Sequence, residues 1–588
     1  MTCLSRPLVL TLALALTAAA GLPAQTAWRF GWEDTWSQLG GLLGAEDAEL
    51  LLGKMAAATE AQAAGGDVNV NGLAGGWASM QASEGAPINF TQSDFLVQRL
   101  QAHGFSLQWE LRLNAAWASA DNPDCYDHEP STHCGPGPAH EDDLYDYVHA
   151  IVERYDGDGF EDMGWQTPGD PADDLLIPVR FYLMQGEIEF TGATPPPEPG
   201  YGDASLNHFW SDSISSLLNS HRIVWSAVHD ADASGGSQVV SSGGVFWDLY
   251  GDFPDYPEPT GETVQARLLG TNNHGAQYIE SFQRIETLLT SFGDDSDGIE
   301  TDYLGWHPHM PWREIDQTFN WIRSLAGDKP IYVDDMWCNI FLEPRADAPG
   351  ATQFTGGGAV IEGDFPNELA ADYQQLYTSV IFTDGAVRAW YYGRHSRHLV
   401  KAFVSAFGEG AERVSVSGNA DLEFLPIPPI WVRGSLLGRI NLMGTAGEGF
   451  FEKPAYWTYR LLVDKLHDFT AVTEIPVSTN PLTRVYRFDR PRGPVWIGWS
   501  ETGGPPPGLD YDVATGETVG FAVGDELLLQ THVVDEPGQS APELSHLSAP
   551  GEIVTLQLGY EPVILEVASL FKDGFESGDS SAWSMTVP

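Results

Sequence analysis

Segments typical of buried β-strands alternate with segments typical of helices along most of this 588-residue chain. The clearest strand pattern is VRFYLMQGEIEF at residues 179–190, an apolar run that ends in the carboxylates Glu187 and Glu189. Regular alternation of this kind predicts parallel strands joined by helical crossovers. We therefore predict an α/β fold, a (β/α)8 TIM barrel, in which functional side chains stand at the carboxyl ends of the strands.

The pattern defines eight strand and helix pairs. We expect strands at residues 28–32, 68–73, 105–113, 178–187, 238–246, 301–306, 331–335 and 412–417. We expect helices at residues 45–63, 93–102, 141–154, 206–228, 277–291, 313–325, 395–407 and 455–466. The eighth strand has an alternative, AVRAWY at 386–391, but 412–417 is preferred because the helix at 395–407 then leads through a turn into a strand.

Beyond residue 470 the sequence changes to short strand patterns with no helical period, such as RVYRFDR, PVWIGWS and EIVTLQLG. Turn-rich stretches such as TGGPPPG separate these patterns, which predicts an antiparallel β-sandwich. The expected domains are thus a barrel over 28–468, a sandwich over 470–567 and a tail over 571–588.

Residues 1–24 have the pattern of a secretory signal peptide, with Arg6 followed by an apolar run and small residues. We expect a secreted protein with no membrane span.

Cys125 and Cys134 flank a polar loop, and in an exported protein this spacing predicts a local disulfide. The alternative is a metal site that these cysteines form with His128 and His133.

The formal net charge of −53 argues against nucleic acid and anionic membranes as partners. Binding to phosphates needs clusters of Lys and Arg, and the chain has none. The chain contains no GxSxG, HExxH, P-loop or dinucleotide motif in a suitable context, and we expect no cofactor and no resident metal. Oligomeric state cannot be predicted from the sequence.

Several segments are similar to the clan-A retaining glycoside hydrolases, in particular to β-xylosidase and cellulase-like barrels. FSLQWELRLNAAWAS at 105–119 resembles the third strand of that family and places Trp117 at the cleft. WHPH at 306–309 resembles its sixth-strand His-Pro element, and KPIYVDDMW at 329–337 resembles its seventh strand. EKPAYW at 452–457 is similar to the start of the last helix. The ending LGYEPVILE resembles the accessory β-domain of the family.

The resemblance implies two catalytic carboxylates. Gln185-Gly186-Glu187 stands where the family has Asn-Glu, which gives Glu187 the acid/base position. The nucleophilic Glu of the family falls on Asp335, with Asp334 as the alternative under a shift of one residue. Retaining hydrolysis is implied by resemblance, but Asp is one methylene shorter than Glu, and a wider gap admits a water and an inverting mechanism. The other expected function is that of a non-catalytic carbohydrate-binding protein derived from a glycosidase barrel.

Aromatic residues fall at or just past several predicted strand ends, where flat rings can stack on sugar faces. They are Trp77, Trp117, Trp306, Trp312 and Trp337. Core packing is the alternative for any single one of them. The expected substrate is a carbohydrate, and its expected binding residues are Trp77, Trp117, His307, His309 and Trp337. Glu189 shares a strand face with Glu187 and is a spare candidate for catalysis.

Overall fold

The computed structural model describes a large part of the chain, and all structural statements below concern this part. It comprises residues 28–34, 39, 43–62, 66–70, 76–123, 125, 134–158, 161, 163, 177–184, 212–232, 234–241, 244–246, 276–293, 299–308, 312, 315–336, 385–421, 441–501, 516–523, 527–548 and 553–567. The predicted signal peptide and C-terminal tail lie outside these residues.

Parallel strands form a nine-stranded sheet in the order β5-β4-β3-β2-β1-β9-β8-β7-β6. The strands are β1 (Phe30–Asp34), β2 (Gly66–Val70), β3 (Phe105–Leu111), β4 (Phe181–Met184), β5 (Gln238–Val240), β6 (Gly244–Phe246), β7 (Leu304–Pro308), β8 (Ile331–Met336) and β9 (Ala411–Ser417). The short β5 and β6 follow each other in sequence, and β5 pairs with β4 whereas β6 pairs with β7. Because Val240 also bridges to Tyr303 before β7, β5 and β6 together fill one barrel position and close the ring. The nine segments thus occupy eight positions, which confirms the predicted (β/α)8 barrel.

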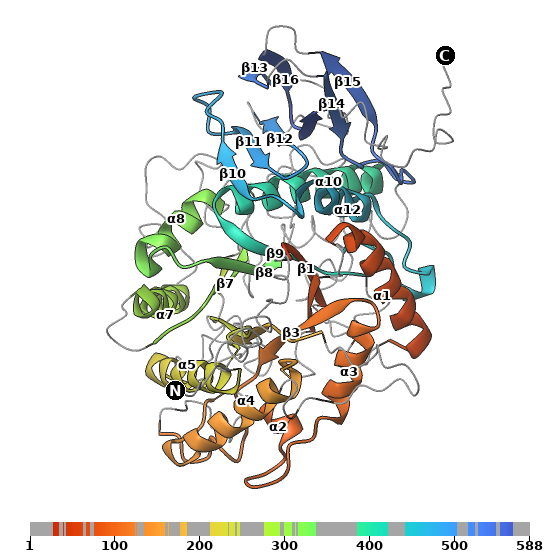
Figure 1. The fold of residues 1–588 in the computed structure, drawn as a ribbon. Helices are drawn as coiled ribbons and strands as arrows, with labels where there is room; N and C mark the ends of the chain where they lie inside the picture. The colour runs from red at the N-terminus through yellow and green to blue at the C-terminus, as the bar shows by residue number, and fades with distance from the viewer. Residues whose placement is uncertain are drawn as a thin grey trace, which may run out of the picture.

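Helices follow the strands and surround the barrel (Figure 1). They are α1 (Ala45–Thr59), the short α2 (Trp77–Met80), α3 (Thr91–Gln101), α4 (Glu141–Tyr155), α5 (Ile214–Ala231), α7 (Ala276–Gly293), α8 (Ile315–Ala326), α10 (Gly385–Gly408) and α12 (Pro454–Leu466). The alternative eighth strand AVRAWY lies inside α10, and β9 takes the preferred position. The segment forms the first turns of α10, whose later residues Leu399, Phe403 and Phe407 recur every four positions and are buried in the main core.

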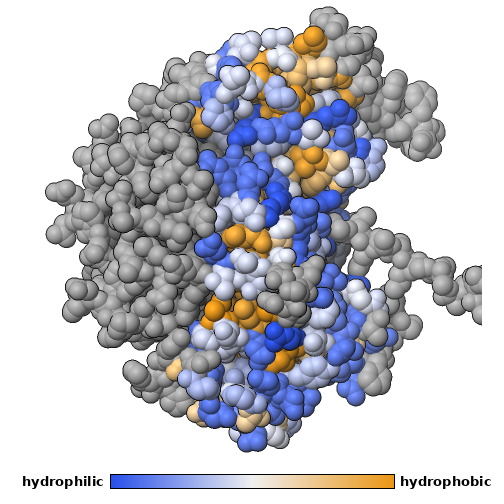
Figure 2. All heavy atoms as spheres, turned by 90° about the vertical axis from the view of Figure 1, so that its left-hand side faces the viewer, coloured by the Kyte–Doolittle hydropathy of each residue, from blue (hydrophilic) through white to orange (hydrophobic). Residues whose placement is uncertain are grey.

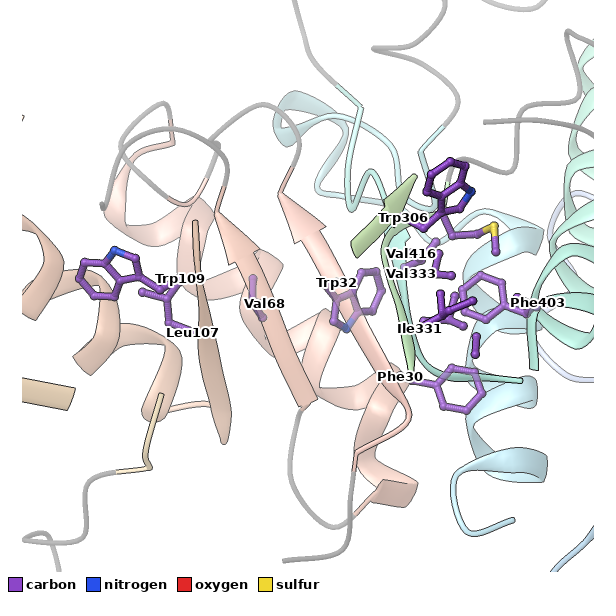
Figure 3. Close-up of a cluster of buried hydrophobic side chains, with 14 of the residues drawn as sticks. Phe30, Trp32, Val68, Leu107, Trp109, Trp306, Ile331, Val333, Phe403 and Val416 are labelled. Carbon is purple, nitrogen blue, oxygen red and sulfur yellow. The ribbon is translucent and has the colours of Figure 1, made fainter. Parts of the chain in front are cut away.

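Side chains along the barrel strands alternate between the helix layer and the barrel interior. On β1, Phe30 and Trp32 point outward into the main core, where Phe30 stacks on Phe403 at 5.8 Å between ring centroids (Figure 3). Their neighbours Gly31 and Glu33 point inward. A Cβ atom on Gly31 would lie 2.5 Å from Ser415 Oγ on β9, so only glycine fits at this position of the interior.

The interior of the barrel is filled by side chains in layers. Near the amino ends of the strands, Arg413 pairs with Asp67 at 3.2 Å and its guanidinium lies 4.2 Å from the ring centroid of Phe181. Burial raises the pKa of Asp67 to about 6, and Arg413 opposes this shift. In the next layer the Tyr332 hydroxyl donates to Gln108 Oε1 at 3.0 Å. Since this packing leaves a solid core rather than a pore, ligands have access only at the ends of the barrel.

Antiparallel strands make up the C-terminal part of the described chain. One sheet has the order β10-β11-β12-β17-β14-β15, and β13 pairs with β16 in a second sheet. Their bounds are β10 (Ala471–Glu474), β11 (Thr483–Asp489), β12 (Val495–Ser500), β13 (Glu517–Ala522), β14 (Leu527–His532), β15 (Leu544–Ser548), β16 (Ile553–Leu558) and β17 (Val563–Val567). A separate core joins Val485 and Trp496 of the first sheet to Phe521 and Leu556 of the second, which confirms a β-sandwich.

Helices α10 and α12 lie between the barrel strands and these sheets (Figure 1). Buried polar contacts cross the junction: the Trp312 indole donates to Glu501 Oε1 at 2.9 Å, and Lys401 pairs with the same carboxylate. On the face drawn in Figure 2, hydrophilic side chains cover most of the coloured surface and hydrophobic ones form small groups. None of the helices in the described residues combines the length and the apolar character that a membrane crossing requires.

Cys125 and Cys134 form the predicted disulfide, with their Cα atoms 5.6 Å apart. The bond closes the loop that follows β3, on the side of the barrel where the carboxyl ends of the strands emerge. It also occupies both thiols, so the alternative metal site that uses these cysteines is not formed.

Candidate active site

Three acidic side chains and one histidine converge at the carboxyl ends of neighbouring barrel strands. Glu33 is on β1, His307 on β7, and Asp334 and Asp335 are on β8, which is separated from β1 only by β9. All four are buried, with exposed fractions of 6% or less. Burial of several ionisable groups is costly and is typical of functional sites.

A β-bulge in β8 brings both aspartates to the same side of the strand. Val333 pairs with Val414 on β9, but the next pair is Met336 with Val416, so β8 has one residue more than its partner. Val333 and Met336 both belong to the core that faces the helices. The extra residue therefore allows Asp334 and Asp335 to lie together between them and to reach His307. Bulges that redirect side chains in this way are common next to active sites.

His307 lies between the two aspartates. Its Nε2 atom is 2.9 Å from Asp334 Oδ2, and its Nδ1 atom is 3.7 Å from Asp335 Oδ2. The other oxygen of Asp334 accepts a hydrogen bond from the backbone N–H of Trp306 at 3.2 Å. Asp334 is thus fixed by two donors from β7, and it in turn orients the imidazole toward Asp335.

Glu33 approaches the cluster from β1. The Ser417 hydroxyl on β9 donates a hydrogen bond to Glu33 Oε2 at 2.9 Å, and a second hydrogen bond joins the carboxyl groups of Glu33 and Asp335. Burial raises the pKa of Glu33 well above its usual 4.5, and the adjacent charge of Asp335 raises it further, whereas His307 and Ser417 act in the opposite direction. A hydrogen bond between two carboxyl groups requires a proton on one of them, so the pair holds one acid and one carboxylate.

This arrangement supplies an ionised carboxylate with a defined orientation at the carboxyl end of the barrel. Retaining glycosidases place their two catalytic carboxyl groups about 5 to 5.5 Å apart, and inverting ones place them about 6.5 to 9.5 Å apart. Glu33 and Asp335 are in direct hydrogen-bond contact, so they are too close to act on opposite sides of a glycosidic bond. A catalytic partner for Asp335 therefore has to come from another strand.

Of the predicted site residues, the structure brings together His307, Asp335 and the alternative Asp334. Glu187, Glu189, His309 and Trp337 lie outside the described residues, so their roles stay predictions. Among the described residues there is no group of three or more His, Cys, Asp or Glu side chains arranged to hold a metal ion.

The structure buries three of the tryptophans that fall near predicted strand ends. Trp77 is fully buried: it stacks on Tyr147 at 5.6 Å between ring centroids, and its indole N–H donates to Gln81. Trp306 and Trp312 are also core residues, at 1% and 2% exposure. Trp306 packs edge-to-face on Trp321 of α8 and Trp312 packs edge-to-face on Trp499 of β12, so these rings lack a free face for a sugar. Trp117 is half-buried against Trp77 and retains part of its surface.

Glu33 and Ser417 were not among the predicted site residues. The predicted first strand ended at residue 32, so Glu33 comes directly after it, and a carboxylate in that position of a barrel strand is itself a signal. Ser417 closes the predicted eighth strand, but a lone serine gives no such signal. Only the barrel order, which places β1 next to β9, relates these two residues to Asp335.

No protein-family model matches the chain, and no curated protein matches it. The structure is similar to solved glycoside hydrolases. One is a family 39 glycoside hydrolase from the gut symbiont Bacteroides cellulosilyticus WH2, with 12% identity, 92% of this chain and 81% of that chain covered, and a TM-score of 0.46. Another is a monomeric β-xylosidase from Caulobacter crescentus CB15, with 11% identity, 93% and 96% coverage and a TM-score of 0.48. A third is a family 30 endoxylanase from Clostridium papyrosolvens C71, with 9% identity, 93% and 97% coverage and a TM-score of 0.43. All three belong to the class that the sequence resembles, and this similarity concerns the fold and assigns no residue a role.

Proposed function

We propose that the protein is a secreted O-glycosyl hydrolase that cleaves a plant- or microbe-derived polysaccharide or oligosaccharide with two carboxylates. Asp335 is the carboxylate on β8. Glu187, which follows β4 in the sequence, is the acid that protonates the leaving oxygen. The observation that carries the proposal is the position of Asp335: it stands at the carboxyl end of a barrel strand, in contact with both His307 and Glu33.

Asp335 suits either of two reactions. As a nucleophile it attacks the anomeric carbon and forms a glycosyl-enzyme intermediate, which retains configuration after hydrolysis. As a general base it takes a proton from water, which then attacks the sugar with inversion. Both reactions need an ionised Asp335.

The competing function is carbohydrate binding without hydrolysis. A binding barrel depends on exposed aromatic rings, and Trp77, Trp306 and Trp312 are all buried. It has no use for a buried cluster of carboxyl groups, which costs folding free energy to maintain. The described residues therefore favour catalysis over binding.

The test is a screen of the wild-type protein on xylan, β-glucan and aryl glycosides, followed by Glu187→Gln. The amide keeps the shape of the side chain but cannot deliver a proton, a contribution worth typically about 10² to 10⁴ in rate. Glu189→Gln tests the spare candidate, and loss of activity there instead of in Glu187→Gln would assign the acid to Glu189. Binding of oligosaccharides without turnover of any substrate by the wild type would reject the hydrolase in favour of the binding protein. N-terminal sequencing of the protein recovered from the culture medium tests export, and a start after residue 20 or 24 is expected.

A further inference from the structure

The contact between Glu33 and Asp335 spans an intervening strand. β9 lies between β1 and β8, and its inward side chains at this level are Ser415 and Ser417. Such small side chains leave room for the two carboxyl groups to meet above them. The Ser417 hydroxyl also donates a hydrogen bond to Glu33 Oε2, so the Glu33 carboxyl group is hydrogen-bonded both to Ser417 and to Asp335.

We propose that Glu33 is a positioning residue for Asp335: its protonated carboxyl donates a hydrogen bond to the Asp335 carboxylate, keeps that carboxylate ionised and fixes its orientation toward the substrate. This inference rests on the catalytic role of Asp335 proposed above. It adds a third carboxyl, from the first barrel strand, to the two that the sequence resemblance implies.

The charges around Glu33 explain why it carries the proton. The groups that face it are Asp335, with Asp334 beside it on β8, His307 on β7 and the uncharged Ser417 on β9. When Glu33 is neutral, the carboxylates next to His307 are those of Asp334 and Asp335. Ionisation of Glu33 would place another negative charge next to Asp335, in a buried site where like charges repel more strongly than in water. Burial and this repulsion both raise the pKa of Glu33, in agreement with the geometry.

Loss of the proton has a consequence for the reaction. When Glu33 ionises at high pH, the hydrogen bond to Asp335 is lost and the two carboxylates repel each other. A displacement of about 1 Å at a reacting group can cost about a hundredfold in rate. We therefore expect kcat/KM of the wild type to fall as pH rises through the folded-state pKa of Glu33, which lies above the usual 4.5.

Kinetics of four proteins test this expectation. In Glu33→Gln the amide N–H replaces the carboxyl O–H as donor to Asp335, so kcat/KM at the optimum should stay within about tenfold of the wild type and this fall with rising pH should disappear. Ser417→Ala removes a hydrogen bond that lowers the pKa of Glu33, so the fall should move to higher pH. Ser415→Ala, the matched control one interior position earlier on β9, should leave the profile in place. A fall of kcat/KM with rising pH that survives unchanged in Glu33→Gln would overturn the inference.

Infrared spectroscopy provides a second readout that does not require activity. The carbonyl stretch of a protonated carboxylic acid is distinct from that of a carboxylate, and Glu33 should contribute it in the wild type above pH 4.5, where an ordinary glutamate has ionised. This contribution should be missing in Glu33→Gln, in which other buried acids such as Asp67 still absorb, and should titrate at lower pH in Asp335→Asn, where the neighbouring charge is gone. If the protein turns over no glycoside but shows this band, the proposed function fails and the proton on Glu33 stands. If the wild type lacks the band, the inference fails whatever the activity.

Discussion

His307 Nε2 and Asp334 Oδ2 lie 2.9 Å apart inside the barrel, and the other ring nitrogen of His307 faces Asp335 at 3.7 Å. Asp334 accepts a hydrogen bond from Nε2–H, so it decides which tautomer the ring adopts and how the ring presents Nδ1 to Asp335. In the prediction from the sequence, Asp334 is only an alternative to Asp335. The structure gives the two aspartates different tasks, because one orients the histidine and the other faces Glu33.

Asp334→Asn tests this division of tasks. An asparagine amide can donate to Nε2 and so reverse the tautomer, which leaves the fold intact but misdirects the ring. We expect kcat to fall by up to about a hundredfold with little change in KM, since the reacting geometry and not sugar binding is affected. Steady-state kinetics on an aryl glycoside measure both constants. A variant with unchanged kcat would show that His307 has no part in orienting Asp335.

Glu33→Gln should change the pH dependence of stability. A carboxyl whose pKa is higher in the folded protein holds its proton more tightly there, so the free energy of unfolding falls as pH rises from the unfolded value, near 4.5, toward the folded pKa. The variant lacks this decline. Its melting temperature should match the wild type below about pH 4 and exceed it increasingly at higher pH. Asp67, whose pKa burial raises to about 6, contributes a decline of the same sign in both proteins. If the melting temperatures of the wild type and Glu33→Gln differ by the same amount at every pH, the raised pKa of Glu33 is contradicted.

The disulfide between Cys125 and Cys134 should stabilise the loop after β3. The two cysteines are separated by 9 positions, and closing so short a loop contributes on the order of 2 to 3 kcal/mol under the chain-entropy model. Denaturant unfolding of Cys125→Ser/Cys134→Ser measures the loss. A reducing agent should destabilise the wild type and leave the double variant unchanged. If both thiols of the non-reduced wild type react with alkylating agents, the bond is absent.

Lys453 and Asp421 form a buried ion pair at 2.7 Å that ties the chain after β9 to the start of α12. Removing one partner leaves the other charge buried without compensation, so Lys453→Met should cost about 3 to 5 kcal/mol. Arg460 on the same helix pairs with Glu60 at the surface, and Arg460→Met should cost less than about 1 kcal/mol. Chemical denaturation of both variants gives the comparison. Equal losses would show that burial does not distinguish the two pairs.

Much of the barrel is predictable from the sequence because each strand and helix carries its own local pattern. The preferred eighth strand is an example: β9 forms where the apolar alternation of Val414 and Val416 is followed by polar residues. The site is less predictable, since it depends on contacts between strands that are distant in sequence. Glu33 and Asp335 meet only because β1 and β8 flank the same strand, and the bulge that turns Asp335 inward has no local signal.

The environment of the tryptophan rings is also hard to predict from the sequence. A tryptophan near the end of a strand has the same local sequence whether its ring faces a cleft or a helix. The alternation of β7 decides for Trp306, because His307 occupies the inward position and Trp306 must face outward. Trp77 is buried by Tyr147 of α4, a contact between separate segments that no local pattern reveals.

The central claim is that Asp335 is a catalytic carboxylate, and hydrolysis of an activated aryl glycoside by Asp335→Asn tests it most directly. Asp328→Asn, the same substitution at an exposed position just before β8, is the control and should retain full activity. Asp335→Asn should lose activity by at least about a hundredfold. Azide should restore turnover with an inverted product if the enzyme is retaining, and should not if Asp335 activates water. A folded Asp335→Asn protein with wild-type kcat/KM would contradict the account.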